Sequence, residues 1–572
     1  MHIDKIQSIK NYRNLSGEMI YFDKELNFFI GENNIGKTNI LELINIILSQ
    51  GSFKEDDFYE VCEPIEIKFT IAYNEYELGF FENNFDVEDA YSISIIAKQD
   101  SVDDRIRYFH DTPLESEISS KFIRRLNTLY YYAQRTPGKE IDFRKKQGSG
   151  RVLNYLIDYN LKKEGLGDGK ILKIRNIDKV LKKVNKNIDN INSITGDRIK
   201  AYRKNNAKDI LSGILGIGDG NNRDLTSLGQ GIQYAFNILL QIMDVIYSVK
   251  ISNKREDFEE RLIYSGDKRF FPIFLILDEP EIHQHPYRQR SLIKKIHELI
   301  ENKNVEFATL LKDLFEIDGL TGQIFIATHS PNILLDSYKQ FIRIYIDKKE
   351  VDSPKILSGS NIQLDDGVYK HLLHNYIYLK EAMFSRFIVF VEGDTEFGSI
   401  PVLANRMQLD LDEKSIGIVK LDGADSVKKC LSLYKNFNIK SVAIIDGDKR
   451  DKYSGIEHVY FTNGNDFEED IYDNFKLSDY LLCCKELGIL DKYIGILKKR
   501  NIEFDVNKFK KNPLIIEIDD DLQKEIMINN RENELCFLKS SKNASKGSIL
   551  SNYVTEIPSS YKKVISLLKK EV

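Results

Sequence analysis

The chain has 572 residues, of which 42% are hydrophobic and 30% charged, and its formal net charge is -6. This length is too great for one hydrophobic core and predicts two or three domains, with the composition of an ordinary soluble globular protein. No apolar run reaches the roughly 18 residues that a membrane helix needs, and the first residues lack the apolar segment of a signal peptide. We therefore expect a cytoplasmic protein with no membrane partner. Because the net charge is small and negative, any contact with nucleic acid needs a local basic surface. Five cysteines without a Cys-x-x-Cys pair argue against a zinc site and a disulfide framework.

A phosphate-binding loop is predicted near the N-terminus. Residues 26–30 read LNFFI, typical of a short buried strand, and residues 31–38 read GENNIGKT, a GxxxxGK[ST] match followed at once by a helical pattern. In this setting the backbone N–H groups of the loop wrap the phosphates of ATP, and the positive end of the helix faces them. Lys37 is expected to reach the β- and γ-phosphates, and Thr38 to offer its hydroxyl to Mg²⁺. The predicted nucleotide-binding residues of this segment are Gly31, Asn34, Gly36, Lys37, Thr38 and Asn39.

Two later apolar strands end in residues suited to ATP hydrolysis. Residues 274–280 read FLILDEP, in which Asp278 is expected to hold Mg²⁺ and Glu279 to polarise the attacking water. Residues 323–330 read QIFIATHS, and the position of His329 fits a sensor of the γ-phosphate. Buried parallel strands end in polar residues in many folds, but seldom in two adjacent acids.

Residues 227–231 read SLGQG and precede a further helical pattern. A Ser/Gly turn also caps ordinary helices, but this one stands after the phosphate loop and before the acidic strand. It resembles the signature of ABC ATPases, which closes over ATP held by the partner subunit. The resemblance implies that Ser227, Gly229 and Gln230 bind nucleotide in trans, and that the chain forms a homodimer or a higher homo-oligomer.

Together these motifs resemble those of ABC ATPases of the RecF/SMC/Rad50 type. The opening segment 9–15, IKNYRNL, resembles the first strand of that family, and Arg13 in it is a candidate nucleotide contact. Residues 279–286, EPEIHQHP, resemble the family's Glu-Pro-Glu-x-His-x-His-Pro run. We interpret its histidines as subunit-interface residues, and a metal site at this His pair is the less favoured alternative.

An insertion is predicted between the phosphate loop and the signature. Residues 160–209 contain 14 Lys or Arg against 6 Asp or Glu, and their apolar positions recur at helical spacing. Two interpretations remain open: a dimerising helical arm, or a basic surface that faces DNA. Because an apolar stripe must pack on something, a helical dimerisation insertion at about 150–212 is favoured. The stripe consists of Ile171, Ile174, Leu181, Val184, Ile188 and Ile191.

Carboxylates dominate the motifs beyond residue 385. Residues 387–391, FIVFV, end at Glu392, with Glu396 four residues on, and residues 441–445, SVAII, end at Asp446-Gly447-Asp448. The carboxyl ends of parallel strands meet at one edge of a sheet, where gathered acids repel one another unless divalent cations neutralise them. Oxygen-only ligands favour Mg²⁺ or Mn²⁺ over zinc. An Asp-Gly pair also occurs in tight turns that bind no metal.

This pattern resembles the Toprim domain of topoisomerases, primases and OLD-family (overcoming lysogenisation defect) nucleases. The Glu-Gly-x-x-Glu form after an ABC ATPase points to the OLD nucleases, which include Gabija-type antiphage nucleases. Residues 466–471, DFEEDI, resemble their third acidic motif, and residues 542–547, KNASKG, resemble their late lysine motif. The implied chemistry is two-metal phosphodiester hydrolysis with Lys546, or as second choice Lys542, as catalytic lysine. The implied metal ligands are Glu392, Asp446 and Asp448 at one ion, and Glu396, Glu468 and Asp470 at the other.

The resemblances cover nearly the whole chain and imply an α/β fold: an ABC-type ATPase domain over 1–375 with a helical insertion, then a Toprim domain over 380–572 with its own helical insertion at about 475–536. They imply a nucleotide-gated, ATP-binding and metal-dependent endonuclease that acts on double-stranded DNA in antiphage defence, with a UvrD-like helicase as partner if the chain is of the Gabija branch. The alternative is a nucleic-acid-binding ATP switch of the RecF type with a non-cleaving Toprim scaffold, which predicts poorer acidic motifs. Strand passage would need a tyrosine domain, and primer synthesis a zinc module, and the sequence supports neither.

Overall fold

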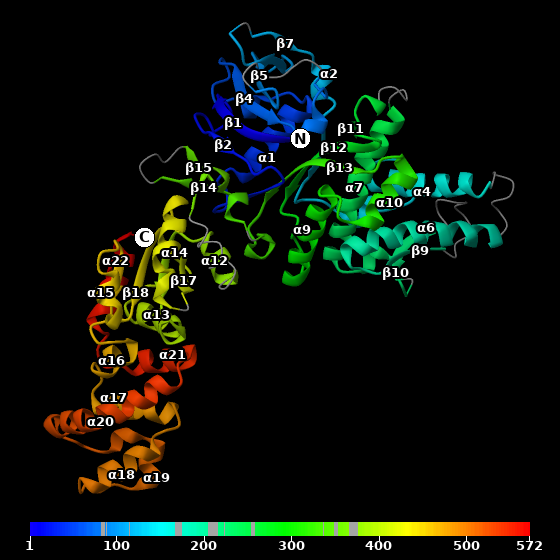
Figure 1. Cartoon of the computed structure of the whole chain (residues 1–572). Helices are drawn as coiled ribbons and strands as arrows, with labels where there is room; N and C mark the ends of the chain where they lie inside the picture. The colour runs from blue at the N-terminus through cyan, green and yellow to red at the C-terminus, as the bar shows by residue number, and fades with distance from the viewer. Residues whose placement is uncertain are drawn as a thin grey trace. The chain divides into compact units, whose positions relative to one another are not determined.

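A computed structural model describes residues 1–81, 86, 89–113, 115–165, 174–203, 215–221, 223–252, 258–335, 337–347, 353–364, 376–421 and 423–571. The chain divides into two compact units, Met1–Gln363 and Leu364–Val572 (Figure 1). The division falls before the boundary that the sequence predicts near 375–380, and residues 365–375 lie outside the described ones.

The core of unit 1 is a seven-stranded sheet in the order β11-β12-β13-β3-β14-β15, with β8 also paired to β12. The strands β8, β12, β13, β3 and β14 run parallel. All residues of β3 and β13 are buried, as is usual for a parallel sheet covered on both faces. The bounds are β3 (Leu26–Ile30), β8 (Asn127–Tyr131), β11 (Ile263–Ser265), β12 (Lys268–Asp278), β13 (Gly319–Ala327), β14 (Phe341–Ile346) and β15 (Pro354–Ser358).

A second, antiparallel sheet of unit 1 has the order β2-β1-β4-β5-β6-β7. Its apolar side chains form one hydrophobic cluster with the buried face of α1 (Lys37–Ser49) and with β12, so α1 is held between the two sheets. The bounds of its strands are β1 (His2–Lys10), β2 (Ile20–Tyr21), β4 (Ile65–Ala72), β5 (Ser92–Gln99), β6 (Arg107–His110) and β7 (Glu117–Ile118).

The remaining helices of unit 1 are α2 (Ser120–Ile123), α3 (Pro137–Glu140), α4 (Gly148–Lys163), α6 (Ile174–Thr195), α7 (Gln230–Ser252), α9 (Pro286–Ile300) and α10 (Val305–Phe315). Of these, α7, α9 and α10 contact strands of the parallel sheet, and α4 and α6 pack on α7. Among the described helices α7 alone is long and apolar enough to cross a membrane. Its most apolar stretch is 78% buried inside the protein, which is the behaviour of a core helix.

The segment predicted as a helical insertion also contains strand. After α6, strand β9 (Ile199–Arg203) pairs antiparallel with β10 (Leu215–Asp219). The side chains of Asn185 and Asn192 on α6 bond to the backbone of β9, which holds this extended segment against the helix. The buried stripe of α6 packs against α4, α7, α9 and α10 of the same unit. It therefore has a partner without a second subunit, and Ile171 and residues 204–212 lie outside the described part of the insertion.

Unit 2 contains a four-stranded parallel sheet in the order β17-β16-β18-β19. Its strands are β16 (Phe387–Val391), β17 (Ile416–Lys420), β18 (Lys440–Ile445) and β19 (Val459–Phe461). The same unit contains the helices α12 (Tyr376–Ala382), α13 (Asp394–Arg406), α14 (Val427–Asn436), α15 (Arg450–Tyr453), α16 (Phe467–Tyr472), α21 (Ala544–Tyr553) and α22 (Ser559–Glu571). The segment 475–536 consists of α17 (Leu477–Glu486), α18 (Asp491–Lys499), α19 (Val506–Lys511) and most of α20 (Asp520–Ser540). Figure 1 shows α18 and α19 at the end of unit 2 away from its sheet.

Candidate nucleotide and metal sites

The phosphate loop leaves β3 and enters α1 at Lys37. At Gly31, φ is 152° and an added Cβ would lie 2.4 Å from the carbonyl oxygen of Ile344, so a side chain cannot be accommodated. The ammonium of Lys37 donates to the carbonyl oxygens of Gly31 at 2.9 Å and Glu32 at 2.6 Å. Burial lowers the pKa of Lys37 to about 8, although Glu279 and Asp278 favour its charged form. The lysine is thus held inside the loop, where a bound phosphate would replace the two carbonyl contacts.

The acids of β12 lie beside this loop. Thr38 Oγ1 donates to Asp278 Oδ2 at 3.4 Å, and burial together with the neighbouring Glu279 raises the pKa of Asp278 to about 6. Asp278 is in register with Ala327 on β13, so the residues that follow the two strands lie side by side. His329 Nε2 is 3.5 Å from Glu279 Oε1. Thr38, Asp278, Glu279 and His329 therefore gather at one end of the sheet, next to Lys37.

Two further residues support this end of the sheet. Glu281 is buried, accepts hydrogen bonds from the hydroxyl of Thr328 and from the backbone N–H of His329, and has its pKa raised to about 7 by burial. It fixes the turn that carries His329. Arg13 is engaged with Asp57, Glu42 and the side chain of Asn39, so its guanidinium is bound to the first turns of α1 and to the 55–57 turn.

The signature residues line a separate hollow of about 680 Å³. Ser227, Gly229 and Gln230 are exposed in it, and none of its lining residues comes from the phosphate loop. The backbone of the signature loop is fixed by Gln233, whose Nε2 donates to the carbonyl oxygen of Leu228 at 2.9 Å. Of the two exposed histidines of the EPEIHQHP run, His283 lines this hollow and His285 caps α9.

In unit 2 the carboxylates gather at the carboxyl edge of the sheet. Glu392 follows β16 and Asp446 follows the adjacent β18, and the backbone N–H of Asp446 donates to Glu392 Oε2 at 3.1 Å. Glu396 is 3% exposed in the first turn of α13, and Glu468 is 0% exposed in α16. Burial and the nearby Glu468 raise the pKa of Glu396 to about 7. Burial, Glu396 and Glu392 raise the pKa of Asp446 to about 8.

In the described part of the chain, three buried oxygens at this edge have neither a hydrogen bond nor an ion pair: Glu396 Oε2, Asp446 Oδ1 and Glu468 Oε1. A buried carboxylate oxygen without a donor is costly, and a cation would relieve that cost. Oxygen donors alone suit a hard divalent ion such as Mg²⁺. The residues present therefore fit a divalent-metal site.

The two late lysines differ in where their ammonium groups lie. Lys542 Nζ is 2.9 Å from Glu468 Oε2. Lys546 is 5% exposed, and its ammonium donates to the carbonyl oxygens of Phe537 and Leu538 and to the hydroxyl of Ser541. Lys546 thus caps the end of α20, while Lys542 faces the acids. The structure brings to the carboxylates the lysine that the sequence ranks second.

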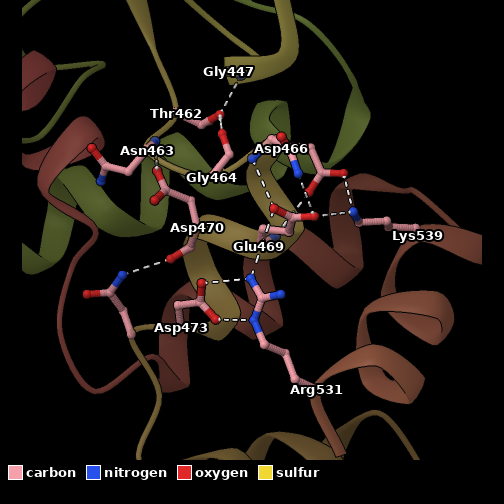
Figure 2. Close-up of polar contacts among 12 residues, drawn as sticks. Gly447, Thr462, Asn463, Gly464, Asp466, Glu469, Asp470, Asp473, Arg531 and Lys539 are labelled. Carbon is pink, nitrogen blue, oxygen red and sulfur yellow. Dashed lines mark hydrogen bonds and ion pairs between the residues drawn. The ribbon is translucent and has the colours of Figure 1, made fainter. Parts of the chain in front are cut away.

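Two predicted ligands stand apart from the buried group. Asp448 is exposed, and its carboxylate lies 2.9 Å from the ammonium of Lys449. Asp470 is buried, but its Oδ2 accepts from the backbone N–H of Asn463 (Figure 2). The same oxygen accepts from the hydroxyl of Ser560. These contacts join the loop before α16 to α22, so Asp470 is occupied in holding the fold together.

Among the described residues, one group of three brings potential metal-ligand atoms within 4.8 Å of one another, namely Glu25, His297 and Glu301 of unit 1. The imidazole nitrogens of His297 lie 3.1 Å from Glu25 and 3.7 Å from Glu301. These two contacts explain why the three side chains lie together. Among the described carboxylates at the edge of the unit 2 sheet, no three residues have ligand atoms within 4.8 Å of one another.

Comparison with known families agrees with the division into two units. The family model of the AAA ATPase domain matches residues 1–149 and 128–334, which together span more than half of the 572 residues. The chain belongs to the AAA ATPase domain family. The model of the overcoming lysogenization defect protein-like TOPRIM domain matches residues 383–448. This AAA-family chain therefore carries an OLD-like TOPRIM domain after its ATPase, and the predicted α/β fold class is confirmed.

Individual relatives match shorter stretches. An uncharacterized protein of Methanocaldococcus jannaschii is 28% identical over 283 residues, 45% of this chain and 64% of the relative. The DNA replication and repair protein RecF of Leptospira biflexa is 46% identical over 57 residues, which is 10% of this chain and 15% of RecF. The chain thus spans less than two thirds of either relative.

Solved structures resemble part of this chain weakly. An SMC head bound to the C-winged helix domain of ScpA has a TM-score of 0.38 and 16% identity, and covers 63% of this chain and 98% of its own. The RecF–ATP structure has a TM-score of 0.30 and 15% identity, and covers 62% of this chain and 97% of its own.

The TOPRIM match ends at Asp448, so the third acidic motif and the late lysines of this AAA-family chain rest on its own geometry. Sequence reasoning did not identify Lys539, which lies between Asp466 and Glu469 in Figure 2. It also assigned no role to Glu281, although this residue is part of the EPEIHQHP run. Lys539 belongs to no motif, and no sequence signal could have found it.

Proposed function

We propose that the chain is an ATP-binding DNA endonuclease that requires Mg²⁺ or Mn²⁺, with cleavage in the TOPRIM domain and control by the ATPase domain. The observation that carries the proposal is a set of buried carboxylate oxygens of Glu396, Asp446 and Glu468 that have no partner among the described residues and lie beside the ammonium of Lys542. A group of acids that served only as a scaffold would need donors for these oxygens.

In this proposal the acids divide into two ligand sets. Glu392 and Asp446, with the exposed Asp448, would hold one ion, and Glu396 with Glu468 would hold the other. Bound divalent ions supply a water nucleophile of lowered pKa and a counter-charge for the phosphate oxygens. Glu392 is oriented by the backbone N–H of Asp446. Lys542, rather than Lys546, would stabilise negative charge that develops on the phosphate, because its ammonium already faces the acids.

The ATPase domain would act as the regulator. Lys37 and Thr38 would bind the phosphates and Mg²⁺ with Asp278, while Glu279 and His329 would face the γ-phosphate. Because the signature hollow contains no phosphate-loop residue, Ser227, Gly229 and Gln230 would complete the site of a second subunit. The proposal therefore includes a homodimer or a higher homo-oligomer on double-stranded DNA, in the cytoplasm and in antiphage defence. A UvrD-like helicase is the partner proposed if the chain is of the Gabija branch.

Plasmid cleavage tests this function. Purified wild type and Glu392→Ala are incubated with supercoiled plasmid in Mg²⁺ or Mn²⁺, with and without ATP. Nicked or linear product in the wild-type lanes alone supports the nuclease, and the ATP lanes give the sign of regulation. Absence of cleavage in every lane, with ATP hydrolysis retained, would favour an ATP switch of the RecF type.

A further inference from the structure

One lysine joins the helix that carries Glu468 to the helix that leads to Lys542. Lys539, near the end of α20, has its ammonium 2.8 Å from Asp466 Oδ2 and 2.8 Å from Glu469 Oε1 (Figure 2). The two acids lie on either side of Glu468 in the sequence. The lysine therefore holds the first turn of α16 from both sides of the buried carboxylate.

Both acids also fix that turn directly. Asp466 is the N-cap of α16, and its Oδ1 accepts from the backbone N–H of Glu469 at 3.0 Å. Glu469 Oε2 accepts from the backbone N–H of Asn465 at 3.0 Å. Lys539 thus binds the two side chains that hold the backbone on either side of Glu468. A shift of Asp466 or Glu469 would therefore shift the carboxylate of Glu468.

On the other side, Lys542 lies on the short connection between α20 and α21, just after Lys539. Lys546 binds the end of α20 through the carbonyl oxygens of Phe537 and Leu538. The connection is therefore held at both ends: Lys546 on α21 binds the end of α20, and Lys539 on α20 binds the acids at the start of α16. Lys539 relates it to the first turn of α16 through Asp466 and Glu469, and Lys542 on the connection reaches Glu468 itself.

We propose that Lys539 is a positioning residue for the metal site: its two ion pairs set the separation between the first turn of α16 and the end of α20, and so hold Glu468 and Lys542 in place. This inference rests on the proposed function. A partly exposed ion pair contributes little to the stability of a protein. Groups that orient metal ligands nevertheless alter metal affinity by roughly 10- to 100-fold when they are removed. Loss of Lys539 is therefore expected to affect metal binding more than folding.

Arg531 provides a matched control on the same pair of helices. Its Nε and Nη2 lie 2.7 Å and 2.9 Å from the carboxylate oxygens of Asp473, at the other end of α16 (Figure 2). Its side chain is 37% exposed, close to the 34% of Lys539. Its Nη2 also lies 4.0 Å from Glu469 Oε2, a much longer contact than the 2.8 Å between Lys539 and Glu469. Arg531→Met therefore removes an ion pair between α16 and α20 whose short contacts are with Asp473, and it leaves both ion pairs of Lys539 in place.

The test measures Mn²⁺ binding to the full chain without nucleotide, by electron paramagnetic resonance of the free ion, with Glu468→Ala defining the signal of the TOPRIM site. Lys539→Met should weaken this binding by roughly 10- to 100-fold, Lys539→Arg should restore most of it, and Arg531→Met should leave it within about threefold of wild type. Melting temperatures should fall by similar small amounts in Lys539→Met and Arg531→Met.

Equal Mn²⁺ affinity in Lys539→Met and wild type would overturn the inference, as would an equal loss in Arg531→Met. If wild type binds Mn²⁺ at this site and cuts plasmid DNA while Lys539→Met binds equally well, the positioning role fails and the proposed function stands. If wild type neither binds Mn²⁺ there nor cuts DNA, the proposed function fails and the positioning role fails with it.

Discussion

The ammonium of Lys542 lies 2.9 Å from Oε2 of Glu468, a carboxylate that is 0% exposed. A buried charge is costly unless a partner compensates it. Burial disfavours the charge of Lys542, yet Glu468, Asp446 and Glu396 together raise its pKa. The lysine is therefore charged at neutral pH, and its ammonium lies next to the carboxylates that would bind the proposed metal ions.

Replacement of Lys542 is expected to remove cleavage without unfolding the protein. Lys542→Met should lower the rate of plasmid cleavage by about 10²- to 10³-fold, the usual loss when one charge-stabilising group is removed. Its melting temperature with Mg²⁺ bound should stay close to that of wild type, because the cation compensates the buried carboxylate of Glu468 once the ammonium is gone. Cleavage at the wild-type rate would contradict the role proposed for Lys542.

Replacement of Lys546 is expected to act through stability instead. Lys546→Met leaves the carbonyl oxygens of Phe537 and Leu538 without their donor, and a lost buried hydrogen bond costs about 1–3 kcal/mol. Denaturant unfolding of unit 2 should shift accordingly, and residual cleavage per folded molecule should exceed that of Lys542→Met. The reverse order of the two variants would restore Lys546 as the charge-stabilising lysine.

The stability of the metal-free protein is expected to fall as pH rises. The pKa of Glu396 is raised to about 7 and that of Asp446 to about 8, so the folded state keeps protons that the unfolded state has already released. The free energy of unfolding should therefore decrease between about pH 5 and pH 8, and flatten above it. Thermal melting in a metal chelator, across this range, measures the effect.

Mg²⁺ should reverse this trend, because it binds the deprotonated acids. The gain in melting temperature on adding Mg²⁺ is expected to be larger at pH 8 than at pH 6. Asp278 and Glu281 of unit 1 also have raised pKa values, so Glu396→Gln is the necessary comparison. An unchanged pH slope in that variant would show that Glu396 contributes little to the trend.

Removal of the loop lysine should separate nucleotide binding from metal chemistry. Lys37→Ala is expected to weaken ATP binding by roughly 10- to 100-fold, because a charge-assisted hydrogen bond contributes about 1.5–3 kcal/mol. Mn²⁺ binding in unit 2 should persist. Isothermal titration with ATP and plasmid cleavage without nucleotide measure the two effects, and loss of cleavage under every nucleotide condition would contradict independent nuclease chemistry.

A large side chain at Ser227 should block assembly and leave each subunit able to bind ATP. Ser227 is exposed in a hollow that contains no residue of its own phosphate loop. Ser227→Arg is therefore expected to abolish ATP-dependent self-association in sedimentation velocity while ATP affinity changes by less than about threefold. A variant that assembles as wild type does would argue against use of the signature by a second subunit.

The sequence alone determined the ATPase family, the order of the two domains and the edge at which the acids gather. Contiguous motifs are readable because neighbouring residues build them: Gly31 to Thr38 form one loop between one strand and one helix. Glu392 and Asp446 could be expected together because each follows a strand, and parallel strands end at the same edge.

Only the tertiary structure decided which residues of the later motifs face that edge. Lys542 and Lys546 are four residues apart, but a connection precedes α21, so one ammonium meets Glu468 and the other caps α20. Asp470 shares a motif with Glu468 and turns to Asn463 instead. Such choices depend on where α16 and α20 pack, and contacts between distant segments, such as that of Lys539 with Asp466, leave no local pattern in the sequence.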